Sequence, residues 1–438
     1  MNKTLKIDKT DKVDKANKVD KANKVDRAKA GKVDIAIKAN KADKANTTVV
    51  VGLSGGVDSA VSAALLKEQG YKVIGVFMHN WEESDESGQC LSELDFADVK
   101  AVGATLGIPV YSVNFAKQYR ENVFSHFLAE LKAGRTPNPD VLCNREIKFG
   151  PFIDYAKTLG ADYVATGHYA GVERAECFCG GGAIEPTCCK ARYYLVKPKD
   201  TNKDQTYFLC QLNQKQLSQI LFPLQHYTKD EVRQLAKKYN LHIADKKDST
   251  GICFVGKRNF KEFLQNYLPA QVGQIKESNA DGRVLGTHTG LMYYTIGQRK
   301  GIGIGETKKS AGGVASGADT SAYFVVDKDV STNTLYVSTN DKLLYSSSLV
   351  ADNVNWIVSA NSEQQTANSD QRPEISDKSF ECYAKVRYRQ AEQQVKVTLL
   401  DNGKVQVDFK EAQRAITKGQ YVVFYSDRYC LGGGVIIG

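Results

Sequence analysis

The spacing of apolar and polar residues along the chain follows two patterns, and the first gives way to the second near residue 260. Residues 48–53 form a short β-branched apolar run, typical of a strand that is buried on both faces. A Ser/Gly turn follows it, and apolar residues then recur at helical spacing as far as Gly70. Further apolar runs, separated by helical stretches, are residues 73–78, 109–113 and 162–166. Strands that alternate with helices predict a parallel sheet, with ligands bound at the carboxyl ends of its strands.

Beyond residue 260, short segments rich in Tyr, Val and Thr replace the helical pattern, and Gly, Asn and Asp separate them. The predicted strands are residues 292–296, 323–327, 334–338, 380–389, 394–400, 405–409 and 420–425. Their spacing is typical of antiparallel modules or a small barrel. Residues 307–321 and 359–377 are predicted to be polar loop insertions. The predicted fold class is α/β: a parallel-sheet, nucleotide-binding domain followed by two mainly β domains, the last a small β-barrel.

The same patterns divide the chain into four segments. Residues 1–46 repeat a Lys-Val-Asp phrase and contain 13 Lys, 1 Arg and 7 Asp but hardly any large apolar residue. Such a segment cannot offset the entropy of ordering, so we expect a disordered tail, either merely solvated or touching RNA transiently. The other predicted segments are a catalytic nucleotide-binding domain (47–259), a central mainly β domain (260–329) and a C-terminal barrel-like domain (330–438).

Composition narrows the class of protein. With 438 residues the chain is long enough for two or three domains, and no apolar run reaches the roughly 18 residues of a membrane-spanning helix. The tail carries +7 of the net charge of +9, and the nearly neutral body does not fit a protein that coats DNA. The first residues lack a secretory signal and fit a mitochondrial transit peptide poorly, so we expect a cytoplasmic protein. The ten cysteines lack the dense spacing of a secreted disulfide scaffold, which favours reactive thiols.

The clearest motif lies between the first predicted strand and its helix. Glycines there let the backbone turn tightly and approach an anion, and the helix N-terminus adds positive potential. Because no Gly-Lys-Ser/Thr follows, it is not a Walker A loop. Asp58 could hold Mg²⁺ against bound phosphates, whereas the plainer alternative is a glycine turn with a serine cap. The residues of this phosphate loop are Gly52, Leu53, Ser54, Gly55, Gly56, Val57, Asp58 and Ser59.

Two cysteines lie in polar, turn-forming segments. Residues 134–144 contain two prolines, which we expect to exclude a helix, and they present Asp140 and Cys143 three residues apart. Cys253 follows a Ser-Thr-Gly turn. A single cysteine is more often a small buried residue than a nucleophile. Their shared polar context, in a chain that also has a phosphate loop, favours two reactive thiols.

The phosphate loop resembles that of the ATP pyrophosphatases, which split ATP between the α and β phosphates and pass AMP to a carbonyl oxygen. With residues 166–169, 203–208 and 297–301, it makes the chain similar to the tRNA-specific 2-thiouridylase family over residues 49–436. The resemblance implies that the 2-oxygen of the wobble uridine is replaced by sulfur in tRNAs for Lys, Glu and Gln. It also implies that the C-terminal barrel binds tRNA.

The resemblance assigns roles by position. It implies that residues 52–59, Met78 and Gly167 bind ATP, with Mg²⁺ as the expected metal but no metal centre of the protein's own. Cys143 is the expected nucleophile and Cys253 the carrier of the persulfide sulfur, while the chemistry itself suggests Asp140 as the proton shuttle. The residues expected to contact the target base or the rest of the tRNA are Asn138, Pro139, Asp140, His168, Lys203, Asp204, Gln205, Arg387, Tyr388 and Gln420. The expected partners are tRNA and a persulfide relay protein or cysteine desulfurase, with no DNA and no membrane.

The implied chemistry needs these parts. A uridine 2-carbonyl is a poor electrophile because oxide is a poor leaving group, and adenylation turns that oxygen into AMP. A persulfide, most reactive as the anion, then supplies sulfur. The second thiolate can release the product and leave a Cys143–Cys253 disulfide, which a reductant must open.

A local pattern also suggests an RNA-binding surface. If residues 380–389 form one strand, Tyr383, Lys385, Arg387 and Arg389 alternate onto one face. Three cations beside an aromatic ring suit phosphate contacts and stacking. A merely solvated strand face explains the pattern equally well.

Three alternatives stay open. One is a zinc site, although the spacing does not match paired zinc knuckles; its residues would be Cys177, Cys179, Cys188 and Cys189. Another is a different pyrophosphate-loop ligase, similar to argininosuccinate synthase, which would need neither thiol. The third is an RNA-binding protein whose nucleotide loop only regulates affinity, and which would release no pyrophosphate.

Overall fold

The computed structural model describes residues 41–82, 91–175, 191–248, 259–279, 281–304, 322–357 and 378–438. Cys253, the four cysteines considered for zinc and both predicted insertions lie outside these residues. The expectation of a tail without structure up to residue 46 is wrong at its end, because residues 41–46 form helix α2 (Lys41–Asn46). The Thr47 hydroxyl donates to the Asp43 carbonyl at 2.8 Å, and Lys44 lies 5.3 Å from the ring centre of Tyr71. These contacts fix the helix to the start of the sheet.

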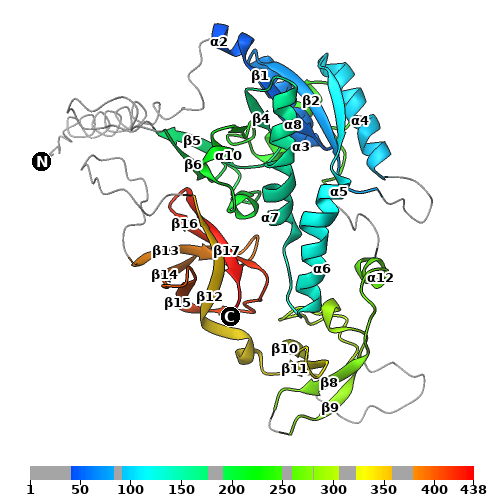
Figure 1. Cartoon of the computed structure of the whole chain (residues 1–438), viewed down its shortest axis with the longest axis vertical. Coiled ribbons are helices and arrows are strands. Elements are labelled where there is room, and N and C mark those ends of the chain that lie inside the picture. The colour runs from blue at the N-terminus through cyan, green and yellow to red at the C-terminus, as the bar shows by residue number, and fades with distance from the viewer. Residues whose placement is uncertain are drawn as a thin grey trace, which may run out of the picture. The chain divides into compact units, whose positions relative to one another are not determined.

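The first domain is built on a sheet of order β3-β2-β1-β4-β7, in which every pairing is parallel (Figure 1). The central strand β1 (Thr48–Leu53) is buried on both faces, as predicted. Val49 and Val51 pack with α3 (Val57–Glu68) in one core, and Val50 packs on the other face with α8 (Pro151–Thr158). The remaining strands are β2 (Lys72–His79), β3 (Val110–Asn114), β4 (Tyr163–Ala165) and β7 (Ile220–Leu221).

Helices flank both faces of this sheet. The first domain also contains α4 (Leu91–Leu106), α5 (Ala116–Tyr119), the π-helical turn η1 (Arg120–Phe124), α6 (Ser125–Lys132), α7 (Pro139–Cys143), the π-helical turn η2 (Asn144–Lys148), α9 (Thr206–Leu209), α10 (Gln214–Leu217) and α11 (Lys229–Lys238). None of the described helices is long and apolar enough to cross a membrane.

The central domain contains a sheet of order β10-β11-β8-β9. Its elements are α12 (Phe260–Gln265), β8 (Gly273–Glu277), β9 (Val284–His288), η3 (Leu291–Tyr293), β10 (Phe324–Asp329), β11 (Thr334–Ser338) and η4 (Asp341–Leu344). The domain boundary expected at residue 329 is wrong, because β11 pairs with β8 and β10 and so belongs to this sheet. The strand expected at 292–296 is also wrong. Gly290 (φ +140°) starts a 3₁₀ turn there, closed by a hydrogen bond from the Tyr294 N–H to the Leu291 carbonyl at 3.2 Å.

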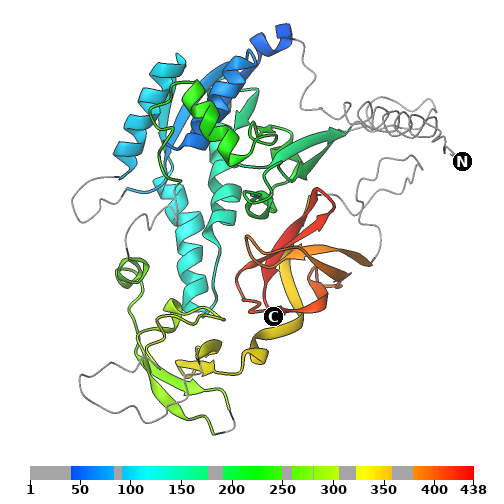
Figure 2. The same ribbon diagram turned by 180° about the vertical axis from the view of Figure 1, so that it is seen from behind.

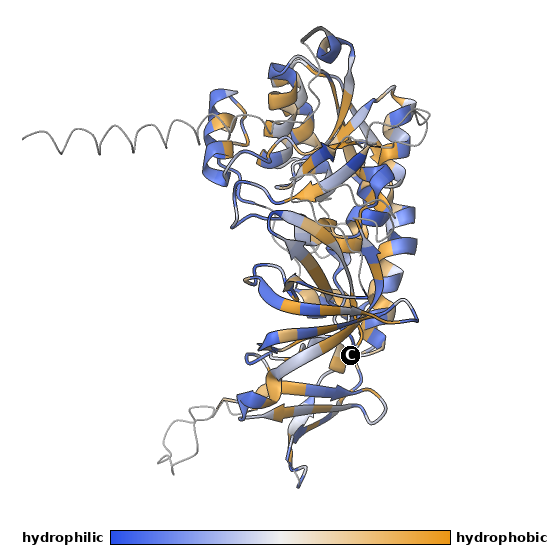
Figure 3. Ribbon diagram, turned by 90° about the vertical axis from the view of Figure 1, so that its left-hand side faces the viewer, coloured by the Kyte–Doolittle hydropathy of each residue, from blue (hydrophilic) through white to orange (hydrophobic). Residues whose placement is uncertain are grey.

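The C-terminal strands close into a barrel, as predicted. Strand β12 pairs with both β15 and β17, which completes the ring β12-β15-β14-β13-β16-β17 (Figure 2). Hydrophobic and hydrophilic residues alternate along these strands, with the hydrophobic ones forming the barrel core (Figure 3). The strands are β12 (Tyr345–Trp356), β13 (Ser379–Lys385), β14 (Gln393–Leu399), β15 (Val405–Arg414), β16 (Tyr421–Ser426) and β17 (Tyr429–Ile436).

A hairpin from the first part of the chain extends the barrel sheet. Strand β5 (Gly171–Ala175) pairs with β6 (Arg192–Val196), and β6 pairs with β17. The Tyr207 hydroxyl donates to the buried Tyr421 carbonyl at 2.9 Å, which adds a second direct link. The catalytic domain and the barrel are therefore joined by strand pairing and buried hydrogen bonds.

Candidate active site

The residues expected to bind the nucleotide gather at one edge of the parallel sheet. The phosphate loop (52–59) begins at the end of β1, Met78 lies near the end of β2 and Gly167 follows β4, and these strands are neighbours. A Cβ on Gly52 would come within 3.2 Å of the Met78 Cε. A Cβ on Gly167 would come within 2.6 Å of the Ser59 backbone nitrogen, so only glycine fits there. The carboxyl edge of the sheet brings the three segments together.

Hydroxyl groups hold the loop in shape. The Ser59 hydroxyl accepts a hydrogen bond from the Ser54 N–H at 3.2 Å and donates one to the Gly56 carbonyl at 3.1 Å. Gly55 has φ +74°, and a Cβ there would come within 2.8 Å of the Asp95 carbonyl oxygen. The loop leads directly into α3, whose first N–H groups favour a bound phosphate.

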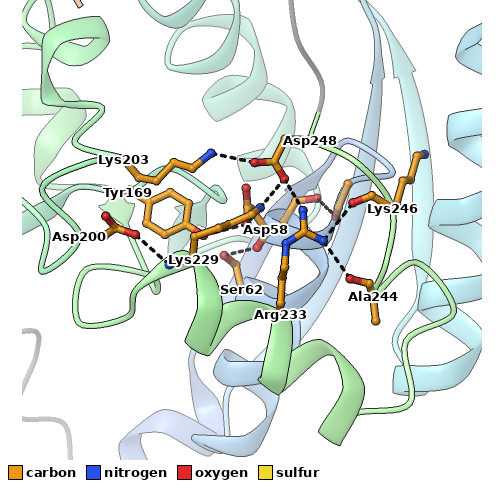
Figure 4. Close-up of polar contacts among 12 residues, drawn as sticks. Asp58, Ser62, Tyr169, Asp200, Lys203, Lys229, Arg233, Ala244, Lys246 and Asp248 are labelled. Atoms are coloured by element: carbon orange, nitrogen blue, oxygen red, sulfur yellow. Dashed lines mark hydrogen bonds and ion pairs between the residues drawn. The ribbon is translucent and has the colours of Figure 1, made fainter. Parts of the chain in front are cut away.

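Asp58, in the first turn of α3, is surrounded by donors. The Tyr169 hydroxyl donates to its Oδ1 at 2.9 Å and the Lys229 Nζ at 2.7 Å (Figure 4). Burial, together with the Asp58 charge, raises the pKa of Tyr169 well above its usual value, so the hydroxyl keeps its proton. Among the described residues, no group of three or more His, Cys, Asp or Glu side chains could hold a metal ion. Mg²⁺ needs only one or two carboxylates when phosphates complete its shell, so Asp58 beside the loop fits this ion.

A cluster of ion pairs links the phosphate loop to the residues just before position 249. The Asp248 carboxylate pairs with three cations, Lys203 at 2.7 Å, Lys229 at 2.7 Å and Arg233 at 3.1 Å. Burial opposes ionisation, but hydrogen bonds from Lys203 and Lys229 lower the pKa of Asp248 to about 2. The Lys246 Nζ donates to the Gly55 carbonyl of the loop at 3.0 Å. In the sequence this segment leads to Cys253, which lies outside the described residues.

The expectation that prolines exclude a helix from residues 134–144 is wrong. Pro139 is the first residue of α7, where its missing N–H costs nothing because the first turn has no backbone partners. The Asn138 side chain caps this helix by accepting the Asp140 N–H at 3.2 Å. Asp140 and Cys143 are three residues apart on α7, and a helix therefore places them on the same face.

The barrel holds the loop that leads into α7. The Gln420 Nε2 donates to the Thr136 carbonyl at 2.8 Å and to the Pro137 carbonyl at 3.4 Å. The Thr136 N–H donates to the Lys418 carbonyl at 2.9 Å. Gln420, expected to contact tRNA, therefore has a structural role in this loop.

The surroundings of α7 shield Cys143 and Asp140 from water. Cys143 is 2% exposed and belongs to the same core as Leu142 and Ile147. Burial raises the pKa of Asp140, and the charge of Lys148 only partly opposes it. A carboxyl group whose pKa lies closer to neutrality is better suited to exchange a proton at physiological pH.

His168 lies in the turn after β4, next to the phosphate loop, and packs against residues that follow α7. Its ring packs against Phe149 and Phe222, and its Nδ1 lies 2.7 Å from the Thr166 hydroxyl. Burial lowers the pKa of His168 well below 6.5, and the charge of Lys148 lowers it further, so the ring is neutral at pH 7. Lys148 acts on both His168 and Asp140. The only sequence signal for it was its place five residues after Cys143.

The segment 203–205 was expected to contact tRNA, and in the structure each of its side chains has a protein partner. Lys203 pairs with Asp248 at 2.7 Å. Asp204 is 7% exposed and accepts the Lys385 ammonium at 3.1 Å. The Gln205 side chain accepts the Tyr169 N–H at 2.8 Å, which fixes the turn after β4.

The basic face predicted for a strand at 380–389 is only partly present, because the strand is shorter than expected. Strand β13 ends at Lys385, because the Val386 N–H turns to the Gln390 side chain (3.0 Å) and Arg389 adopts φ +66°. Lys385 is neutralised by Asp204, so it is not a third cation available to a phosphate. Arg387 is exposed.

A pocket of about 660 Å³ opens beside this turn. Its lining includes Lys203, Asp204, Lys385, Tyr388 and Arg389, from both the catalytic domain and the barrel. The Tyr388 ring lies 4.4 Å from the ring of Phe208, centre to centre. The pocket thus brings together two segments that were predicted separately to contact tRNA.

Comparison with known proteins agrees with this architecture. The tRNA methyl transferase HUP domain model matches residues 47–257, the tRNA methyl transferase PRC-barrel domain model residues 261–339 and the aminomethyltransferase beta-barrel domain model residues 346–436. Fold and site therefore define a HUP-domain protein with two β domains.

The chain belongs to the tRNA-specific 2-thiouridylase family. It is 52% identical over 390 residues to the tRNA-specific 2-thiouridylase MnmA 1 of Geobacillus kaustophilus, covering 89% of this chain and 95% of that relative. It is 53% identical over 390 residues to the MnmA of Streptococcus pyogenes serotype M2, covering 89% and 94%. Among solved structures, the U34-tRNA thiolase NcsA from Methanococcus maripaludis is 19% identical, with a TM-score of 0.30 over 51% of this chain and 68% of that one.

Two residues of the site were given no role from the sequence, although Tyr169 lies within residues 166–169, which carry the family resemblance. Tyr169 and Lys229 both contact Asp58, but they lie 111 and 171 residues away from it in the chain. The pairing of β4 with β1 and the packing of α11 on α3 bring them to the phosphate loop.

Proposed function

We propose that the protein is an ATP-dependent tRNA-uridine 2-sulfurtransferase that acts on the wobble uridine of tRNAs for Lys, Glu and Gln. The observation that best supports this is similarity to 2-thiouridylases over 89% of the chain, in which the phosphate loop lies one strand away from the turn that carries His168. A ligase of the argininosuccinate-synthase type would need neither the helix with Cys143 nor the barrel. An RNA-binding protein with a regulatory nucleotide would not need a reactive thiol.

The first step is adenylation of the uridine. The 2-oxygen attacks the α phosphorus of ATP, the bond from that phosphorus to the bridging oxygen breaks, and pyrophosphate leaves. The loop N–H groups and the start of α3 hold the departing phosphates. When bound, Mg²⁺ would be held by Asp58 and would offset phosphate charge.

The second step transfers sulfur. The outer sulfur of a Cys253 persulfide attacks C2 of the base, and AMP leaves with the original oxygen. The Cys143 thiolate then attacks the inner sulfur, which breaks the sulfur–sulfur bond and leaves 2-thiouridine and a Cys143–Cys253 disulfide. A two-electron reductant must open that disulfide before the next turnover. Asp140, on the same helix face as Cys143, exchanges the proton that these steps require.

The partners follow from this reaction. The substrate tRNA would be bound through Asn138, Pro139, Asp140 and His168 near the reacting base, and through residues 203–205, Arg387, Tyr388 and Gln420 farther from it. A persulfide relay protein or cysteine desulfurase would load Cys253. Such a reaction on tRNA belongs to the cytoplasm.

Pyrophosphate release tests the first step separately from the second. We expect the protein to release pyrophosphate from ATP when given tRNA with a wobble uridine, and not when the same tRNA carries a wobble cytidine. Equal release with both tRNAs would contradict the proposed acceptor. Release with no tRNA at all would favour a ligase that uses a small-molecule substrate.

A further inference from the structure

Lys229 holds its charge directly against the phosphate loop. Its Nζ lies 2.7 Å from Oδ1 of Asp58 and 2.7 Å from Oδ1 of Asp248 (Figure 4). The side chain is only 12% exposed, so water screens its charge less than it screens a surface lysine. A buried ammonium beside the expected phosphate site is a candidate for contact with ATP.

The needs of helix α11 do not explain this lysine. A cation in the first turn opposes the helix dipole, and the other charges of α11 follow the favourable pattern, with Asp230 and Glu231 first and two lysines last. Thr228 and Glu231 already form a complete capping box. The Lys229 N–H also donates to Asp200 at 2.8 Å. The start of the helix is fixed without the Lys229 side chain.

Neither carboxylate depends on Lys229 alone. Asp248 keeps Lys203 and Arg233 as partners if Lys229 turns away. Asp58 keeps the Tyr169 hydroxyl, and it is also the residue that fits Mg²⁺. With ATP and its metal bound, Asp58 would gain a new positive partner, and the Lys229 ammonium would be free to contact the phosphates.

We propose that Lys229 is a phosphate-binding residue of the adenylation step. On ATP binding its ammonium exchanges Asp58 for the β and γ phosphates, and it stabilises the negative charge that gathers on pyrophosphate as the bond to the α phosphorus breaks. Lysine suits this role, because it binds phosphate as a point charge on a flexible stem. The inference rests on the proposed function, in which pyrophosphate is the leaving group.

The test compares Lys229→Met, which keeps the length of the side chain without its charge, with Lys229→Arg and with Arg233→Met. Arg233 is the matched control, because it also pairs with Asp248 but has no contact with Asp58 among those found in the structure. Calorimetry measures the affinity for ATP, AMP and inorganic pyrophosphate, and tRNA-dependent ATP–pyrophosphate exchange measures adenylation. Melting curves confirm that each variant is folded, and Lys229→Gln replaces Lys229→Met if that variant does not fold.

We expect Lys229→Met to lose roughly 10²-fold in exchange rate, as when one donor to a developing charge is removed. Its affinity for ATP and pyrophosphate should fall while its affinity for AMP stays at the wild-type value. Lys229→Arg should recover part of the loss, and Arg233→Met should bind all three ligands like wild type. Equal weakening of AMP and ATP, or unchanged pyrophosphate affinity, would show that Lys229 only bridges two carboxylates. If the wild-type protein itself showed no exchange, the proposed function would be in error, while pyrophosphate binding would still decide the role of Lys229.

Discussion

His168 and Asp140 have shifted pKa values for the same reason, because each is partly buried where its charged form is poorly solvated. For His168 the folded pKa lies well below the unfolded value of about 6.5. Below that pH the unfolded chain takes up a proton that the folded chain does not bind, so its contribution to stability is complete above about pH 6.5 and is lost as the pH falls. Wild type should therefore lose stability on acidification more steeply than His168→Gln.

Denaturant unfolding of both proteins across this pH range measures the effect. His126→Gln, on α6, is the control, since His126 is exposed. Parallel pH profiles for wild type and His168→Gln would show that His168 is protonated as easily in the folded as in the unfolded chain.

For Asp140 the sign is reversed. Burial raises the folded pKa above the unfolded value of about 3.9, so the contribution of this carboxyl is favourable in acid and is lost as the pH rises through the folded pKa. Asp140→Asn should therefore melt at a higher temperature than wild type at neutral pH, and the difference should vanish in acid. The same variant should lose about 10²-fold or more in thiolation rate, as expected for a missing proton shuttle. Higher stability with full activity would remove the catalytic role of Asp140, and a lower melting temperature would contradict its desolvation.

At the scale of elements, the loop before α7 depends on the barrel. Gln420→Leu removes the side-chain hydrogen bonds to Thr136 and Pro137, but it leaves the backbone bond from Thr136 to Lys418. We expect a loss of about 1 kcal/mol in unfolding free energy for each strong bond removed, and slower thiolation because α7 is less well positioned. Gln394→Leu, an exposed change on β14 of the same barrel, should alter neither. Normal stability and activity in Gln420→Leu would mean that the loop is held without this side chain.

Arg387, in the turn after β13, is the residue on which the predicted tRNA contact can be tested. Arg387 is exposed, and its Nη2 donates to the Arg414 carbonyl at 3.0 Å. Arg387→Ala should weaken tRNA binding without changing ATP affinity, and a phosphate contact would make the slope of log affinity against log salt shallower by about one unit or less. A base contact would instead make the loss depend on the tRNA and leave the slope unchanged. Lys378→Ala, which also removes an exposed positive charge beside β13, is the control. If both variants bind tRNA like wild type, the exposed basic turn has no part in recognition.

Many of the helices and strands could be predicted from the sequence, because their signals are local. The buried run at 48–53 and the strand at 334–338 have clear apolar patterns, and the structure confirms both. The errors came from context. Pro139 starts a helix because it occupies the one turn that tolerates proline, and the run at 380–389 ends early because Gln390 caps it from the side. The ion pairs of Asp58 and Lys385 join residues far apart in the chain, and no local pattern encodes them.

At the scale of the whole molecule, the catalytic domain and the barrel share buried contacts. Strand β6 pairs with β17, Asp204 pairs with Lys385, and the Tyr207 hydroxyl bonds to the backbone of β16. A tRNA bound at the turn after β13 would therefore lie in a fixed position relative to the loop that leads into α7. This arrangement accounts for a chain that combines a phosphate loop, a buried thiol and a barrel for one reaction.

Nucleoside mass spectrometry of tRNA treated with the protein tests the central claim most directly. Unmodified tRNA for Lys is incubated with ATP, a persulfide donor and either wild type or Cys143→Ser, and calorimetry checks that both bind ATP. We predict 2-thiouridine at the wobble position with wild type and none with Cys143→Ser, whose ATP affinity should be unchanged. A wild-type reaction that yields no thiouridine, or a Cys143→Ser reaction that yields as much as wild type, would contradict the account.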